Sequence, residues 1–108
     1  MQIKEDEIVR AINDRKARAL ERNEGLRQYL KGQGMRLSWK DKPDSLHGWT
    51  EDDEFMIEIY DWSDFWRVIV KKWPSHEKVL HEDVKTMEEV RDLLRRFYEG
   101  EQLELELF

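Results

Sequence analysis

Cysteine is absent from this 108-residue chain, and several kinds of chemistry are excluded with it. Without thiols there are no disulfide bonds, no thiolate nucleophile and no zinc site built on cysteine. A chain without cysteine is also suited to a reducing compartment. The fold must therefore depend on its apolar core, for which five Trp, four Phe and three Tyr supply large side chains.

Long hydrophobic runs are also missing. No stretch of the sequence approaches the roughly 18 apolar residues of a membrane-spanning helix. The first ten residues, MQIKEDEIVR, are charged from the start and lack the apolar centre of a secretory signal peptide. We therefore predict a cytoplasmic protein that does not bind membranes.

Motifs that support catalysis or cofactor binding are not found either. The sequence has no glycine-rich nucleotide-binding pattern and no G-x-S-x-G pattern of serine hydrolases. His76 and His81 are five residues apart, which turns them away from one another in a helix and places them on opposite faces of a strand. His47 is predicted to lie in a loop, with no nucleophile near it in the sequence. We expect no metal site, no cofactor and no enzymatic activity.

Charged residues make up 41% of the chain, and the formal net charge is −6 at pH 7. Residues 41–64 carry nine Asp or Glu and a single Lys. The overall acidity argues against direct binding to nucleic acid. The acidic run has two interpretations, a solvated loop or a surface that imitates a nucleic-acid backbone and inhibits a nuclease or DNA-binding protein. The second interpretation centres on Glu51, Asp52, Asp53 and Glu54.

Two helices are predicted. Residues 4–31 contain no proline, and residues 23–25 are a point where this helix can break in two. Five apolar positions share one face: Ile8, Ile12, Ala19, Leu26 and Leu30. An alternative function is that of an adaptor whose first helix pairs with itself or another helix through Ile8, Ile12, Leu26 and Leu30. The second helix begins at a capping box, Thr86 with Glu89, and ends before Gly100. Its apolar stripe is Val90, Leu93, Leu94 and Phe97.

Alternating apolar and polar residues predict strands at 35–40, 54–61 and 65–73, with a short fourth strand at 78–81. Residues 41–53 are interpreted as a loop or a wide hairpin connection. The expected fold is α+β, an antiparallel meander of three to five strands with an N-terminal and a C-terminal helix packed on it. We predict a single domain over residues 1–108.

The chain closes with QLELELF, residues 102–108. These letters resemble the short peptides with which bacterial proteins dock on the DNA polymerase sliding clamp, of the form Q-L-x-L-F or Q-L-x-L-x-L. Gln102, Leu103, Leu105 and Leu107 match every fixed position of the longer form, and Phe108 adds an aromatic displaced from its place in the shorter form. The resemblance implies that Gln102 enters a polar subsite, while Leu105, Leu107 and Phe108 fill a hydrophobic pocket.

The same residues also suit an edge strand, because leucine and glutamate would point to opposite faces. Residues 101–108 are thus either an edge strand of the domain or a protruding binding peptide. The expected function is a small non-catalytic protein-interaction domain, a bacterial or phage accessory or inhibitor of the sliding clamp. Its expected partner is a protein.

Overall fold

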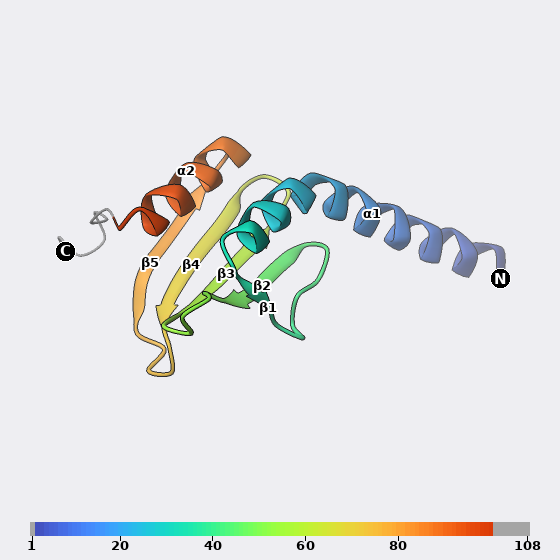
Figure 1. The fold of residues 1–108 in the computed structure, drawn as a ribbon. Helices are drawn as coiled ribbons and strands as arrows, with labels where there is room; N and C mark the ends of the chain where they lie inside the picture. The colour runs from blue at the N-terminus through green and yellow to red at the C-terminus, as the bar shows by residue number, and fades with distance from the viewer. Residues whose placement is uncertain (1, 101–108) are drawn as a thin grey trace.

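The computed structural model describes residues 2–100, which form two helices and one sheet (Figure 1). Helix α1 (Gln2–Gly32) precedes five strands: β1 (Arg36–Leu37), β2 (Ser45–Trp49), β3 (Phe55–Asp61), β4 (Trp66–Lys72) and β5 (Lys78–Val84). Helix α2 (Met87–Tyr98) follows the last of these strands. The arrangement confirms the predicted α+β class.

The sheet is a meander. Its strands follow the chain in the order β1-β2-β3-β4-β5, and each neighbouring pair is antiparallel, as predicted. In β3 and β4, the register sets Ile57 opposite Val70 and Ile59 opposite Val68, so that these four side chains share one face. All four are almost completely buried.

Both helices cover this same face of the sheet. Leu26 and Leu30 of α1 and Val90 and Leu94 of α2 belong to one core cluster with the inward-facing strand residues. Each of these helical side chains is at most 1% exposed, and burying one Leu or Val contributes about 1.5–3 kcal/mol to folding. The core therefore lies in a single layer between the sheet and the two helices (Figure 1).

Helix α2 begins and ends where the sequence predicts. Thr86 precedes its first turn, and the Thr86 hydroxyl accepts a hydrogen bond of 3.1 Å from the backbone N–H of Glu89. At the other end Gly100 has a φ of +76°, a conformation that glycine adopts without steric cost. The Gly100 N–H donates to the carbonyl of Phe97, so the helix stops there and the chain turns away.

Helix α1 differs from its prediction in two ways. It does not break at residues 23–25 but runs without interruption for 31 residues. Its apolar face is also covered only in part, because Ala19, Leu26 and Leu30 are buried whereas Ile8 and Ile12 are 58% and 42% exposed. Leu26 and Leu30 lie in the protein's own core, so the adaptor hypothesis cannot use them for a partner helix.

The predicted loop over residues 41–53 was wrong in its middle, since Ser45–Trp49 is strand β2, paired with both β1 and β3. The first predicted strand is shorter than expected, and Trp39, assigned to it, lies in a turn with 86% of its surface exposed. The last strand is longer than expected and extends to Val84. Sheet pairing rather than local composition decides these segments.

Candidate functional site

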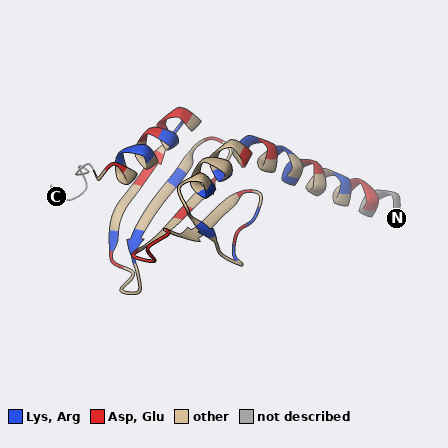
Figure 2. Cartoon of the chain, in the orientation of Figure 1, with Lys and Arg blue, Asp and Glu red and all other residues tan. Residues whose placement is uncertain are grey.

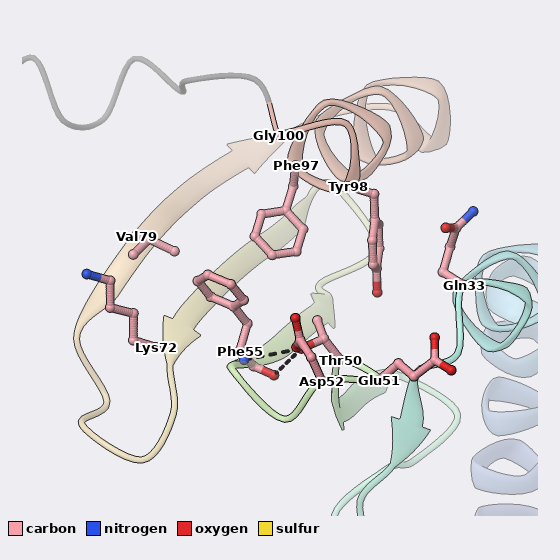
Figure 3. Close-up of a pocket in the computed structure, with 10 residues that line it drawn as sticks. All are labelled: Gln33, Thr50, Glu51, Asp52, Phe55, Lys72, Val79, Phe97, Tyr98 and Gly100. Carbon is pink, nitrogen blue, oxygen red and sulfur yellow. Dashed lines mark hydrogen bonds between the residues drawn. The ribbon is translucent and has the colours of Figure 1, made fainter.

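An open groove of about 660 Å³ lies at the C-terminal end of α2 (Figure 3). Segments that are far apart in the sequence border it: Gln33 after the end of α1, the β2–β3 turn from Thr50 with Phe55, the β4 and β5 residues Lys72 and Val79, and α2 with the following Gly100. We name this feature the α2 groove. It includes the point where residues 101–108 leave the described fold.

Aromatic side chains form the apolar part of the α2 groove. Phe55, the first residue of β3, meets Phe97 of α2 edge to face, with ring centroids 5.1 Å apart. Phe97 contacts the ring of Tyr98 at 5.3 Å. Val79 of β5 lies beyond the two phenylalanines (Figure 3). The groove therefore offers a surface suited to aliphatic or aromatic side chains of a partner.

Tyr98 is the polar element nearest to this apolar surface. Its hydroxyl oxygen is buried and has no hydrogen-bond partner among the described residues. Burial raises the pKa of Tyr98 to about 12, and the nearby Tyr29 and Asp52 act in the same direction. The hydroxyl therefore stays protonated at neutral pH.

The turn between β2 and β3 is held rigid by its own side chains. The Thr50 hydroxyl donates to Asp52 Oδ1 at 2.6 Å and accepts from the N–H of Phe55 at 3.2 Å. Asp52 Oδ1 also accepts from the N–H of Glu54 at 3.0 Å. The hydrogen bond from Thr50, with that from Glu54, lowers the pKa of Asp52. This turn contains all four acids of the predicted acidic surface, and Glu51 and Asp52 line the groove (Figure 3).

Several acids in the run over residues 41–64 are paired with cations. The cations come from α1, β1 and β4. The pairs are Asp41 with Arg27, Asp53 with Arg36, Glu58 with Lys71 and Asp61 with Arg22. They neutralise part of the negative charge that imitation of a nucleic-acid backbone requires. The mimic hypothesis thus stays a prediction, and the four acids of the β2–β3 turn on which it centres are all exposed.

A second polar cluster lies on the face of the sheet opposite the helices. The Glu58 carboxylate accepts a hydrogen bond from the Tyr60 hydroxyl at 2.7 Å and pairs with Lys71 Nζ at 2.8 Å. His47 lies opposite Glu58 in the β2–β3 register, and its ring contacts Tyr60 edge to face. The predicted loop position of His47 was wrong, because the residue is 7% exposed on a strand. Only the strand register brings these side chains together.

The ionisation of this cluster follows from burial and pairing. Burial lowers the pKa of His47, against the opposing effect of Glu58. Burial acts to raise the pKa of Glu58, but the hydrogen bonds from Lys71 and Tyr60 outweigh it and lower that pKa. Asp61 behaves in the same way, with hydrogen bonds from Arg22 and Asn23 overcoming its burial. At neutral pH, His47 is therefore uncharged and both carboxylates are ionised.

These shifts predict that acid destabilises the fold. Each group binds protons less readily folded than unfolded, so its contribution is present above its unfolded pKa and is lost as the pH falls through its folded pKa. Loss should begin below the ordinary value of 6.5 for His47 and continue below 4.5 and 3.8 for Glu58 and Asp61. Urea unfolding at pH 7.5, 5.5 and 3.5 measures this, and His47→Gln should reduce the loss between the first two values. A free energy of unfolding that is the same at all three values would contradict the expectation.

The other histidines do not gather into a site. His76 lies in the β4–β5 turn and contacts the ring of Trp73, whereas His81 lies on β5 near Lys78. Within residues 2–100, no three His, Asp or Glu side chains are grouped so that they could bind a metal ion. In that same part of the chain, neither helix is long and apolar enough to cross a bilayer.

The predicted partner-binding residues Gln102, Leu103, Leu105, Leu107 and Phe108 lie outside the described residues. The described chain ends at Gly100, which lines the α2 groove. Comparison with known proteins adds no relative, because no protein-family model, curated protein or solved structure matches this chain. The groove itself was not predicted, since Phe55 and Phe97 lie far apart in the sequence, with β4 and β5 between them.

Proposed function

We propose that this protein is a small interaction domain that docks on a bacterial DNA polymerase sliding clamp through residues 102–108. It acts as an accessory or inhibitory partner, by binding rather than by catalysis. The observation that carries the proposal is the agreement of Gln102, Leu103, Leu105 and Leu107 with every fixed position of the clamp-binding peptide. An extended peptide of this kind binds through its main chain and a few apolar anchors.

The position of the peptide supports the proposal. The described residues already build a core between sheet and helices, and α2 has a defined end at Gly100 before the peptide begins. A peptide that follows a capped helix can reach a partner without disturbing that core. The competing interpretation, an added edge strand, would require residues 101–108 to pair with β1 or β5, the two outer strands of the described sheet.

The α2 groove supports it as well. From Gly100 to Leu105 the chain spans at most roughly 18 Å, so a partner protein that binds Leu105 to Phe108 can also reach the α2 groove. The aromatic rings of Phe55 and Phe97 would then form a second part of the interface. In this arrangement the folded domain would itself contact the partner, in addition to the peptide.

The decisive experiment measures binding of the purified protein to a purified bacterial sliding clamp by calorimetry. Deletion of residues 102–108 should abolish binding. Leu107→Ala should weaken it by about 30-fold, because loss of a buried anchor costs about 2 kcal/mol. Glu106→Ala is the matched control, since Glu106 occupies a free position of the motif and should change the affinity less than about threefold.

Each other outcome argues against the proposal. If the deleted protein binds the clamp as well as the intact chain does, the peptide is not the docking element. If circular dichroism shows that the deletion unfolds the domain, the segment belongs to the core. A synthetic peptide of residues 101–108 keeps the test independent of folding, because it should compete with the intact protein for the clamp. Equal effects of Leu107→Ala and Glu106→Ala would rule out the motif.

A further inference from the structure

The first half of α1 extends beyond the sheet and packs on nothing within the described structure (Figure 1). Every described residue from Asp6 to Arg18 is exposed. Apolar side chains are nevertheless present there, and Ile8, Val9 and Ile12 are 58%, 54% and 42% exposed. Their cluster is continued by Leu20, which is 45% exposed. We name residues 6–20, of which only Ala19 is buried, the α1 arm.

The apolar residues of the α1 arm form one stripe. At 100° per residue, Ile8, Ile12, Val9 and Leu20 fall within a sector of about 120° on the helix surface. The aliphatic parts of Arg15 and Lys16 lie in or beside the same sector and extend it towards the domain. A stripe of this width is typical of a helix that packs against another element. Among the described residues no such element covers it.

The charges of the α1 arm show what can cover it. Figure 2 shows acidic and basic residues along the helix. The acids Asp6 and Glu7 lie near the outer end with one base, Arg10, and the bases Arg15, Lys16 and Arg18 lie near the domain with one acid, Asp14, so the outer end is net negative and the inner end net positive. None of these seven side chains forms an ion pair or side-chain hydrogen bond with another described residue. A second arm in antiparallel orientation places its acids against these bases and its bases against these acids. A parallel arm places like charges together, which is unfavourable.

We propose that the protein forms a homodimer through antiparallel pairing of two α1 arms, with the two-fold axis beside Ile12. Ile12 then lies near its own copy, and Ile8 packs on the aliphatic part of Lys16 in the second chain. The contact is the same on both chains, as a two-fold interface requires. The pairing also explains why an exposed helix carries Ile and Val, which add little to helix stability on their own.

Absence of native cysteine allows a direct test by disulfide cross-linking. Ile12→Cys, next to the axis, should form a cross-linked dimer on mild oxidation. Ile8→Cys should not, because the two Ile8 positions of an antiparallel pair are separated by roughly 12 Å along the helices, at 1.5 Å per residue. A mixture of Ile8→Cys and Lys16→Cys chains should cross-link more than either variant alone. These exposed positions can be changed without disturbing the core.

Sedimentation of the intact, cysteine-free protein provides the second measurement. It should show a concentration-dependent change from the mass of one chain to that of two, and Ile12→Asp should leave only the single chain. Deletion of residues 102–108 should not alter the dimer. The dimer proposal can therefore fail while the clamp proposal stands, and the reverse is also true. Efficient cross-linking of Ile8→Cys alone would overturn the antiparallel arrangement in favour of a parallel one. A monomer at all concentrations, with no cross-linking of Ile12→Cys, would overturn the dimer altogether.

Discussion

Asn23→Ala should lower the free energy of unfolding by about 3 kcal/mol, a large effect for one polar residue on a helix. Asn23 is 4% exposed and connects α1 to two distant parts of the chain. Its amide oxygen accepts from the indole N–H of Trp66 at 3.0 Å. Its amide nitrogen donates to Asp61 Oδ2 at 2.9 Å and, at 3.3 Å, to the carbonyl of Pro43.

Removal of the amide leaves buried groups without partners. The Trp66 N–H loses its acceptor, and the Asp61 carboxylate, whose side chain is 2% exposed, loses one of its donors. An unsatisfied buried polar group costs about 1–3 kcal/mol, and a charged group costs more. Urea unfolding at pH 7 measures the change. A double-mutant cycle with Trp66→Phe should give a coupling of about 1 kcal/mol for the Asn23–Trp66 hydrogen bond.

Gln28→Ala provides the matched control on the same helix. Gln28 is exposed, and its amide bonds only to Glu24 one turn earlier, at 2.8 Å. Its replacement should change the stability by less than about 0.5 kcal/mol. If Asn23→Ala is as mild as Gln28→Ala, the hydrogen bonds to Asp61 and Trp66 do not hold α1 on the sheet.

The same residue shows where local sequence signals are insufficient. Asn23 and Gly25 are poor helix formers, and they favoured a break at residues 23–25. The helix continues because Asn23 is bonded to residues about 40 positions away along the chain, which local propensity does not register. By contrast, helix α2 was predicted correctly from end to end. Its cap at Thr86 and its apolar stripe both depend on residues within four positions of one another.

Strand β2 and the α2 groove also depend on contacts between residues that are distant in the sequence. Ser45–Trp49 contains a glycine and a histidine between acidic residues, so its composition indicated a loop. It is a strand because β1 and β3 pair with it on both sides. The groove is likewise built where α1, the β2–β3 turn and α2 meet, and its central contact joins Phe55 to Phe97. Sequence periodicity predicted Phe55 on an apolar strand face and Phe97 on an apolar helix face. It did not predict that the two rings are in contact.

Gly48→Ala should destabilise the protein by about 2–3 kcal/mol, the cost of forcing extra volume into a packed site. A Cβ atom on Gly48 would overlap the Met35 methyl group and the carbonyl oxygen of Arg36. The methionine side chain can move aside, but the carbonyl belongs to the backbone of β1. Because β1 has two residues and pairs only with β2, the strand must shift as a whole.

This shift would reach both the core and the groove. Met35, 5% exposed, would leave its buried position, and the ion pair that Arg36 forms with Asp53 in the β2–β3 turn would be broken. Unfolding in urea gives the magnitude, and amide chemical shifts should change most in β1, β2 and that turn. Gly32→Ala is the control, because nothing lies within 4 Å of its added Cβ. Alanine in a helix should raise the stability there, by up to about 1 kcal/mol. Equal stabilities for Gly48→Ala and the parent protein would mean that β1 is not packed against Gly48, and the backbone contact at this edge of the sheet would have to be redrawn.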